Sequence, residues 1–88
     1  MSIYNSTLDE LKSAISDYKE GTVDLNSLKA SVWKAASEIV SVEEKELRIF
    51  LQKAEAELDS LQFTVDDESL FDEALKVTTK IETHLLEN

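Results

Sequence analysis

Carboxylates are the side chains in this sequence with most scope for chemistry, and they gather in one window. From Ala54 to Leu75 the chain has eight acidic side chains and no Lys, Arg or His. The eight are Glu55, Glu57, Asp59, Asp66, Asp67, Glu68, Asp72 and Glu73. They account for most of a formal net charge of −10. Such a field attracts cations or a basic protein surface and repels nucleic acid and anionic lipid.

The remaining residue types form no recognisable catalytic motif. The one histidine, His84, falls in the last turn of the last predicted helix, where a cation suits the helix dipole. A phosphate-binding loop needs several glycines, and the chain has one. A calcium loop needs ligands at alternating positions and a glycine at its turn, which the acids from Asp66 to Asp72 lack. We therefore expect a protein that is not an enzyme and has no cofactor and no metal site.

Charge and composition also restrict the partners. Nine Lys and Arg residues are scattered among nineteen acids, which argues against nucleic acid as a ligand, and an acidic polar surface argues against binding to a membrane surface. No apolar run approaches the ~18 residues of a membrane helix, and no secretory signal opens the chain. With no cysteine, disulfides are excluded. We expect a cytoplasmic protein with a basic protein partner.

Helices must position the acids, because the chain has no proline, one glycine and apolar residues at helical spacing. The first predicted helix runs from a cap at Ser6 or Thr7 to about Glu20, and the third from a Ser41–Glu44 capping box to about Gln62. The second has a cap at Thr22 or Asp24 and an apolar face that reaches Ile39, and the fourth has a cap at Asp66 or Asp67 and an inner face that reaches Leu85. Gly21 is expected to end the first helix at positive φ. The segment Phe63-Thr64-Val65 is expected to separate the last two helices.

Short connections between these helices make successive helices antiparallel neighbours. The sequence therefore predicts an all-α protein, a single domain over residues 1–88 folded as an antiparallel up-down bundle of four helices. The alternative is a three-helix core with a loosely packed first or last helix. The predicted apolar faces include Leu11, Ile15 and Tyr18, then Leu28, Val32 and Ile39, then Leu47, Leu51 and Leu58, and finally Leu70, Phe71, Val77 and Ile81.

The third predicted helix carries a second apolar stripe. Ile49, Ala56 and Phe63 are spaced by seven, roughly opposite the stripe that contains Leu47 and Leu58. The simpler interpretation is that this helix is central and packs against neighbours on both sides. The other is that the stripe is exposed and receives a partner or a second copy of the chain.

One part of the chain resembles the small helical immunity proteins of bacterial toxin systems. The likeness rests on Tyr18-Lys-Glu-Gly21-Thr-Val23-Asp24-Leu25-Asn-Ser-Leu28, on Val32-Trp33, and on Glu55 close to Leu58. In that group a first helix ends in an aromatic-x-x-Gly turn, and a second opens with Leu-x-x-Leu. The chain departs from the nuclease-colicin immunity proteins in lacking their tyrosine-rich signature. The resemblance implies tight binding to a cognate toxin domain and blockage of its active site or substrate groove.

Charge and resemblance lead to one functional hypothesis: a protein that neutralises a basic toxin, a nuclease, by occlusion. The acids of the window would pair with Lys and Arg of the toxin, and Phe63 or Ile49 would anchor the contact. Glu55, Glu57 and Asp59 most need a partner, since acids near a helix C-terminus oppose the dipole. The alternatives are a DNA mimic that inhibits a DNA-binding enzyme and an adaptor that forms a homodimer through Ile49, Ala56 and Phe63.

Overall fold

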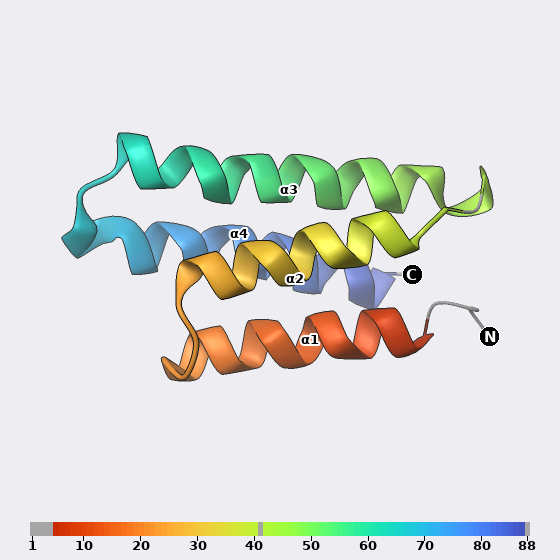
Figure 1. The fold of residues 1–88 in the computed structure, drawn as a ribbon, viewed down its shortest axis with the longest axis horizontal. Coiled ribbons are helices and arrows are strands. Elements are labelled where there is room, and N and C mark those ends of the chain that lie inside the picture. Colours follow the sequence, from red (N-terminus) through yellow and green to blue (C-terminus); the bar gives the residue numbers. More distant parts are fainter. Residues whose placement is uncertain (1–4, 41, 88) are drawn as a thin grey trace.

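The computed structural model describes residues 5–40 and 42–87, and these form a bundle of four helices. The elements are α1 (Asn5–Glu20), α2 (Leu25–Glu38), the short 3-10 helix η1 (Val42–Glu44), α3 (Lys45–Thr64) and α4 (Asp67–Glu87). Successive helices run in opposite directions, and they follow one another round the bundle (Figure 1). α2 packs on α1 and α3, and α4 packs on α3 and returns to α1. The predicted up-down bundle is confirmed.

All four helices contribute to one core. Its fully buried side chains come from α1, α2, α3 and α4 in turn, and include Leu11, Ile15, Leu28, Val32, Leu51, Leu58, Thr78 and Ile81. Thr78 is the one buried polar residue among those described, and its hydroxyl donates to the backbone carbonyl of Leu75 at 2.8 Å. Because α1 and α4 both place residues in this core, the alternative with a loosely packed terminal helix does not hold.

Local sequence chemistry explains the turn between α1 and α2. Gly21 has a φ of +81°, and its N–H and that of Thr22 donate to the carbonyls of Tyr18 and Asp17. This pattern closes a helix that ends in a left-handed residue. Asp24 then caps α2 by accepting the Ser27 backbone N–H at 2.8 Å. Hydrogen bonding from Ser27 holds the pKa of Asp24 below its ordinary value. The prediction for Gly21 is confirmed, and of the two predicted caps, Thr22 and Asp24, the structure uses Asp24.

Two other helix ends differ from the prediction. α1 begins at Asn5, so Ser6 and Thr7 lie inside its first turn rather than at its cap. α3 begins at Lys45, after η1, and the N-cap residue Glu44 makes no side-chain capping bond. The predicted capping partner Ser41 lies outside the described residues. α3 also runs on to Thr64, because Phe63 and Thr64 continue the helix and only Val65 leaves it.

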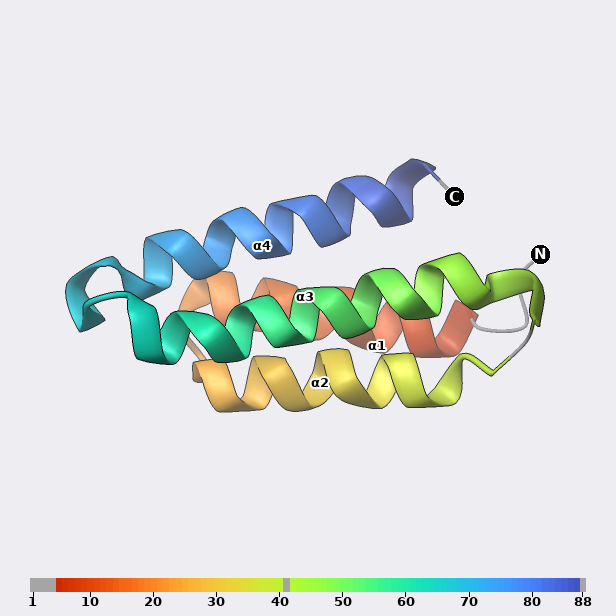
Figure 2. The same ribbon diagram turned by 90° about the horizontal axis from the view of Figure 1, so that it is seen from above.

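The edge between α1 and α4 is held near one end of the bundle. Phe71 on α4 lies against the buried ring of Tyr18 on α1, with ring centroids 5.3 Å apart. Burial raises the pKa of the Tyr18 hydroxyl. Towards its C-terminus α4 diverges from α3 (Figure 2), and there His84 stacks on Phe50 of α3 with centroids 4.2 Å apart. Aromatic contacts thus join α4 to α1 near its start and to α3 near its end.

Candidate protein-binding surface

The second apolar stripe of α3 faces solvent. Phe63 is 81% exposed and Ile49 is 36% exposed, and Ala56 between them is exposed as well. α3 does lie between α2 and α4, but both neighbours pack beside the inner stripe, which contains Leu47, Leu51, Ala54 and Leu58. The interpretation that α3 is covered on both sides is therefore wrong. We call Ile49, Ala56 and Phe63 the outer strip.

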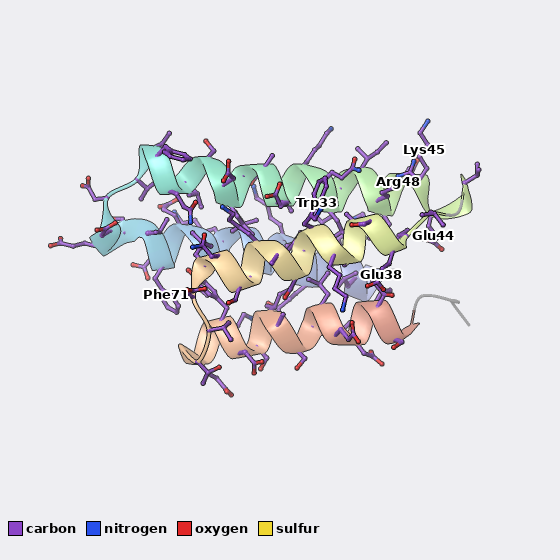
Figure 3. The ribbon with its side chains drawn as sticks, viewed as in Figure 1. Trp33, Glu38, Glu44, Lys45, Arg48 and Phe71 are labelled. Atoms are coloured by element: carbon purple, nitrogen blue, oxygen red, sulfur yellow. The ribbon has the colours of Figure 1, made fainter. Side chains whose placement is uncertain are left out.

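Trp33 extends this apolar surface onto α2. It is 57% exposed, and Figure 3 shows it reaching from α2 towards α3 about midway along both helices. The alignment of α2 against α3 is fixed one turn earlier in α2, where Lys29 donates to Asp59 at 2.8 Å and to Gln62 at 2.9 Å. Trp33 therefore faces the turn of α3 that precedes Asp59, which contains Ala56. From its spacing Trp33 was predicted only to lie on the flank of a buried face, and it was not among the predicted site residues.

Two acids of α3 have partners within the molecule. Asp59 pairs with Lys29 of α2 at 2.8 Å, and Glu57 pairs with Lys80 of α4 at 3.5 Å. Glu55 is half-buried. The argument that Glu57 and Asp59 most need an external partner is therefore wrong, since neighbouring helices supply cations that offset their unfavourable position near a helix C-terminus.

The acids at the start of α4 are arranged differently. Asp66, Asp67, Glu68 and Asp72 are exposed, and no basic side chain within residues 5–40 and 42–87 forms a salt bridge with any of them. Only Glu73, one residue further, is paired, with Lys76 at 2.9 Å. Asp67 and Glu68 lie in the first turn of α4, where acids stabilise the helix. We call Asp66, Asp67, Glu68 and Asp72 the acidic end.

Phe63 joins the acidic end to the outer strip. It lies in the last turn of α3, and Asp66 follows three residues later across the turn into α4. The turn is at the end of the bundle opposite Lys45 and Arg48, which are labelled at the start of α3 in Figure 3. An exposed aromatic ring beside uncompensated acids is an arrangement that suits binding to a basic protein surface.

Small-molecule and metal sites are poorly developed. The larger groove lies between α3 and α4, is lined by Phe50, Ala54 and Val77 among others, and has a volume of about 170 Å³. A second, of about 80 Å³, lies between α1 and α2. Both are smaller than the ~300 Å³ at which typical ligand pockets begin. Within the described part of the chain, no three His, Cys, Asp or Glu side chains converge as metal ligands would.

No helix in the described ranges has both the length and the apolar character needed to cross a bilayer. Comparisons with protein-family models, with curated proteins and with solved structures found no match to this chain. The features of the described chain that suggest a function are the outer strip, the acidic end and Trp33.

Proposed function

We propose that this chain is a binding protein that neutralises a basic toxin by covering its active or substrate-binding surface. One observation carries the proposal. Four exposed acids without a salt-bridge partner in the described chain lie in the turn after α3 and in the first two turns of α4, and the last turn of α3 before them holds a phenylalanine that is 81% exposed. This combination does little for the stability of the isolated chain, because burial would stabilise the ring and nearby bases would stabilise the acids.

The two parts of the surface have different physical roles in binding. Uncompensated acids steer a basic partner into encounter and speed association, most strongly at low salt. A desolvated aromatic anchor then slows dissociation. Phe63 supplies this anchor, with Ile49 further along the outer strip. The acidic end makes the direct contacts with Lys and Arg of the partner, while Glu57, Asp59 and Glu73, which are already paired, add to the field.

A nuclease is the class of toxin that this surface fits best. An enzyme that binds nucleic acid presents Lys and Arg to phosphates, so its substrate surface carries the charge that the acidic end attracts. Occlusion of that surface would block substrate entry without any chemistry by the inhibitor. The resemblance of Tyr18 to Leu58 to toxin-immunity proteins agrees with this class.

The placement of the acids favours this proposal over a DNA mimic. A mimic of a duplex must present negative charge at regular, close intervals along its length, as B-DNA does every ~1.7 Å. Here four of the five acids of the window without a salt bridge in the described chain gather at one end, and two of the acids along α3 are paired with Lys29 and Lys80. A compact charged end beside one aromatic anchor suits a single partner.

The proposal is tested by capture and inhibition. Tagged wild-type protein, a variant with Asp66, Asp67 and Asp72 changed to Lys, and a control with Asp9, Glu10 and Glu46 changed to Lys are used on lysates of the native host. The control has the same net charge as the variant. We expect wild type and control to retain one basic protein in high salt, and the acidic-end variant to lose it.

The captured protein is then expressed alone and together with this chain. We expect it to arrest growth when alone, and wild-type chain to relieve the arrest and inhibit its nuclease activity in vitro. Retention of several unrelated basic proteins that all dissociate in salt would favour the DNA mimic instead. A captured protein whose activity is unaffected by saturating amounts of this chain would refute neutralisation.

A further inference from the structure

The outer strip has a spacing that is symmetric about its centre. Ile49 lies seven residues before Ala56, and Phe63 lies seven residues after it. If two copies of α3 pack antiparallel with Ala56 at the twofold axis, Ile49 of each copy meets Phe63 of the other, about 10 Å from the axis. We infer that the outer strip forms a symmetric contact with a second copy of this chain. This interaction goes beyond the proposed function.

The charges of α3 change sign close to this point, between Lys53 and Glu55. From Lys45 to Lys53 the helix has three bases and one acid, whereas from Ala54 to Thr64 it has three acids and no base. Antiparallel pairing about Ala56 places Lys45–Lys53 of each copy opposite residues 59–67 of the other, which include Asp59, Asp66 and Asp67, while Glu55 falls opposite Glu57. A twofold contact requires such self-complementarity, and a parallel contact would instead put like charges together.

One ion pair across the contact can be assigned. Lys53 and Glu57 both border the groove between α3 and α4, so they lie on the same side of the outer strip. They are three residues before and one residue after Ala56, which leaves Lys53 of one copy and Glu57 of the other within about 3 Å along the helix axis. Twofold symmetry makes this pair twice, and each Glu57 is then shared between Lys80 of its own chain and Lys53 of the other copy.

The centre of the contact has both a small residue and a large one. Ala56 has no side chain beyond Cβ, so the two α3 helices can approach closely at the axis. Trp33 faces the turn of α3 that contains Ala56, and therefore flanks the axis from α2. Trp is among the residues that contribute most to interface energy.

The outer strip is narrow, and the contact should be correspondingly weak. One helix face with Trp33 beside it is a surface at or below the small end of specific interfaces, so we expect a reversible dimer with a dissociation constant in the micromolar range or above. Because Phe63 is needed both here and for the basic partner, the dimer and the partner complex exclude each other.

Disulfide trapping tests the geometry directly, since the chain has no cysteine. Helices packed 8–10 Å apart with Ala at the axis bring two Cβ atoms close to the separation that a disulfide requires. We expect A56C to cross-link with itself quickly. I49C and F63C should each cross-link poorly alone but form a mixed disulfide when combined. T79C, on an exposed position of α4, is the control.

Equally slow cross-linking of A56C and T79C would overturn the contact. Efficient cross-linking of I49C with itself would replace the antiparallel contact with a parallel one. These outcomes are independent of any basic partner, so they do not bear on the proposed function.

Sedimentation velocity of the unmodified chain tests the energetics. K53E should weaken the dimer about three- to ten-fold, and the triple change K53E/E57K/K80E should restore much of the loss, because it reverses the pair and keeps opposite charges at positions 57 and 80. A56E should abolish the dimer, whereas A30E, the same change at an exposed position of α2, should not. Circular dichroism checks that each variant is folded. A wild-type monomer at every concentration up to the millimolar range, or a K53E dimer as strong as wild type, would refute the contact.

Discussion

The inner and outer stripes of α3 are similar in sequence and opposite in environment. The inner stripe contains Leu51 and Leu58, both fully buried, while the outer strip ends in Phe63, which is 81% exposed. Both repeat at spacings that place their members on one helix face. The difference is that α2 and α4 both pack on the inner side of α3. An apolar repeat therefore indicates a helix face that burial would stabilise. Whether that face is buried within the fold depends on where the neighbouring helices pack.

The largest expected effect comes from truncating one member of each stripe. Leu58→Ala should lower the free energy of unfolding by about 2–5 kcal/mol, because it removes buried methyl groups and leaves a cavity. Phe63→Ala, which deletes a larger side chain, should change it by less than about 0.5 kcal/mol. Urea denaturation followed by circular dichroism measures both. Comparable losses of unfolding free energy in the two variants would mean that the outer strip is part of the core, which would contradict the distinction between the two stripes.

Phe71 tests the boundary between the two kinds of apolar residue. It is 41% exposed, yet its ring lies 5.3 Å from that of Tyr18. Phe71→Ala should lower the free energy of unfolding by about 1–2 kcal/mol, because it removes the aromatic pair and buried apolar area between α1 and α4. Phe63→Ala serves as the matched control, since it is the same substitution on an exposed ring. A Phe71→Ala variant as stable as that control would show that the ring pair does not hold α4.

The acids at the start of α4 contribute only modestly to the stability of the fold. Reversal of Asp67 and Glu68 to Lys should cost about 0.3–1 kcal/mol for each residue, because cations oppose the positive end of the helix dipole. The loss should shrink as salt is added. The free energies of unfolding of Asp67→Asn and Glu68→Gln should lie between those of wild type and of the Lys variants. An unfolding free energy independent of both charge and salt would leave these acids with no part in the stability of the fold.

Asp24 gives a small, pH-dependent effect. Its folded pKa is depressed by hydrogen bonding from Ser27, so its stabilisation is present above the unfolded pKa and is lost as the pH falls through the folded pKa. Asp24→Ala should therefore lower the melting temperature at neutral pH, and the difference from wild type should narrow in acid. Asp24→Asn, which keeps a capping oxygen without a carboxylate, should be less pH-dependent than wild type. A difference in melting temperature between wild type and Asp24→Ala that stays constant across the acid range would contradict a stabilising role for the Asp24 carboxylate.

Local chemistry explains which parts of the fold could be predicted from the sequence. Gly21 and Asp24 act within their own turns, and the inner faces follow from helical spacing, so both were predictable. The start of α3 was not, because the intervening η1 has no distinctive sequence signal.

The candidate site was less predictable, because it depends on contacts between helices. The pairing of Asp59 with Lys29 joins residues thirty positions apart, and nothing near either residue indicates the other. The exposure of Phe63 depends on where α2 and α4 pack. Trp33 could be noticed only as a large ring at the flank of an apolar face, and its proximity to the outer strip required the register of α2 against α3.

The role of the acidic end can be measured as the association rate between this chain and the basic protein captured from its host. Stopped-flow mixing at low and high salt, using Trp33 fluorescence, compares wild type with the variant in which Asp66, Asp67 and Asp72 are Lys. We predict fast association that slows steeply with salt for wild type, and slower association with a flatter salt dependence for the variant. Equal rates and equal salt dependence in the two proteins would contradict the assignment of the acidic end as the binding surface.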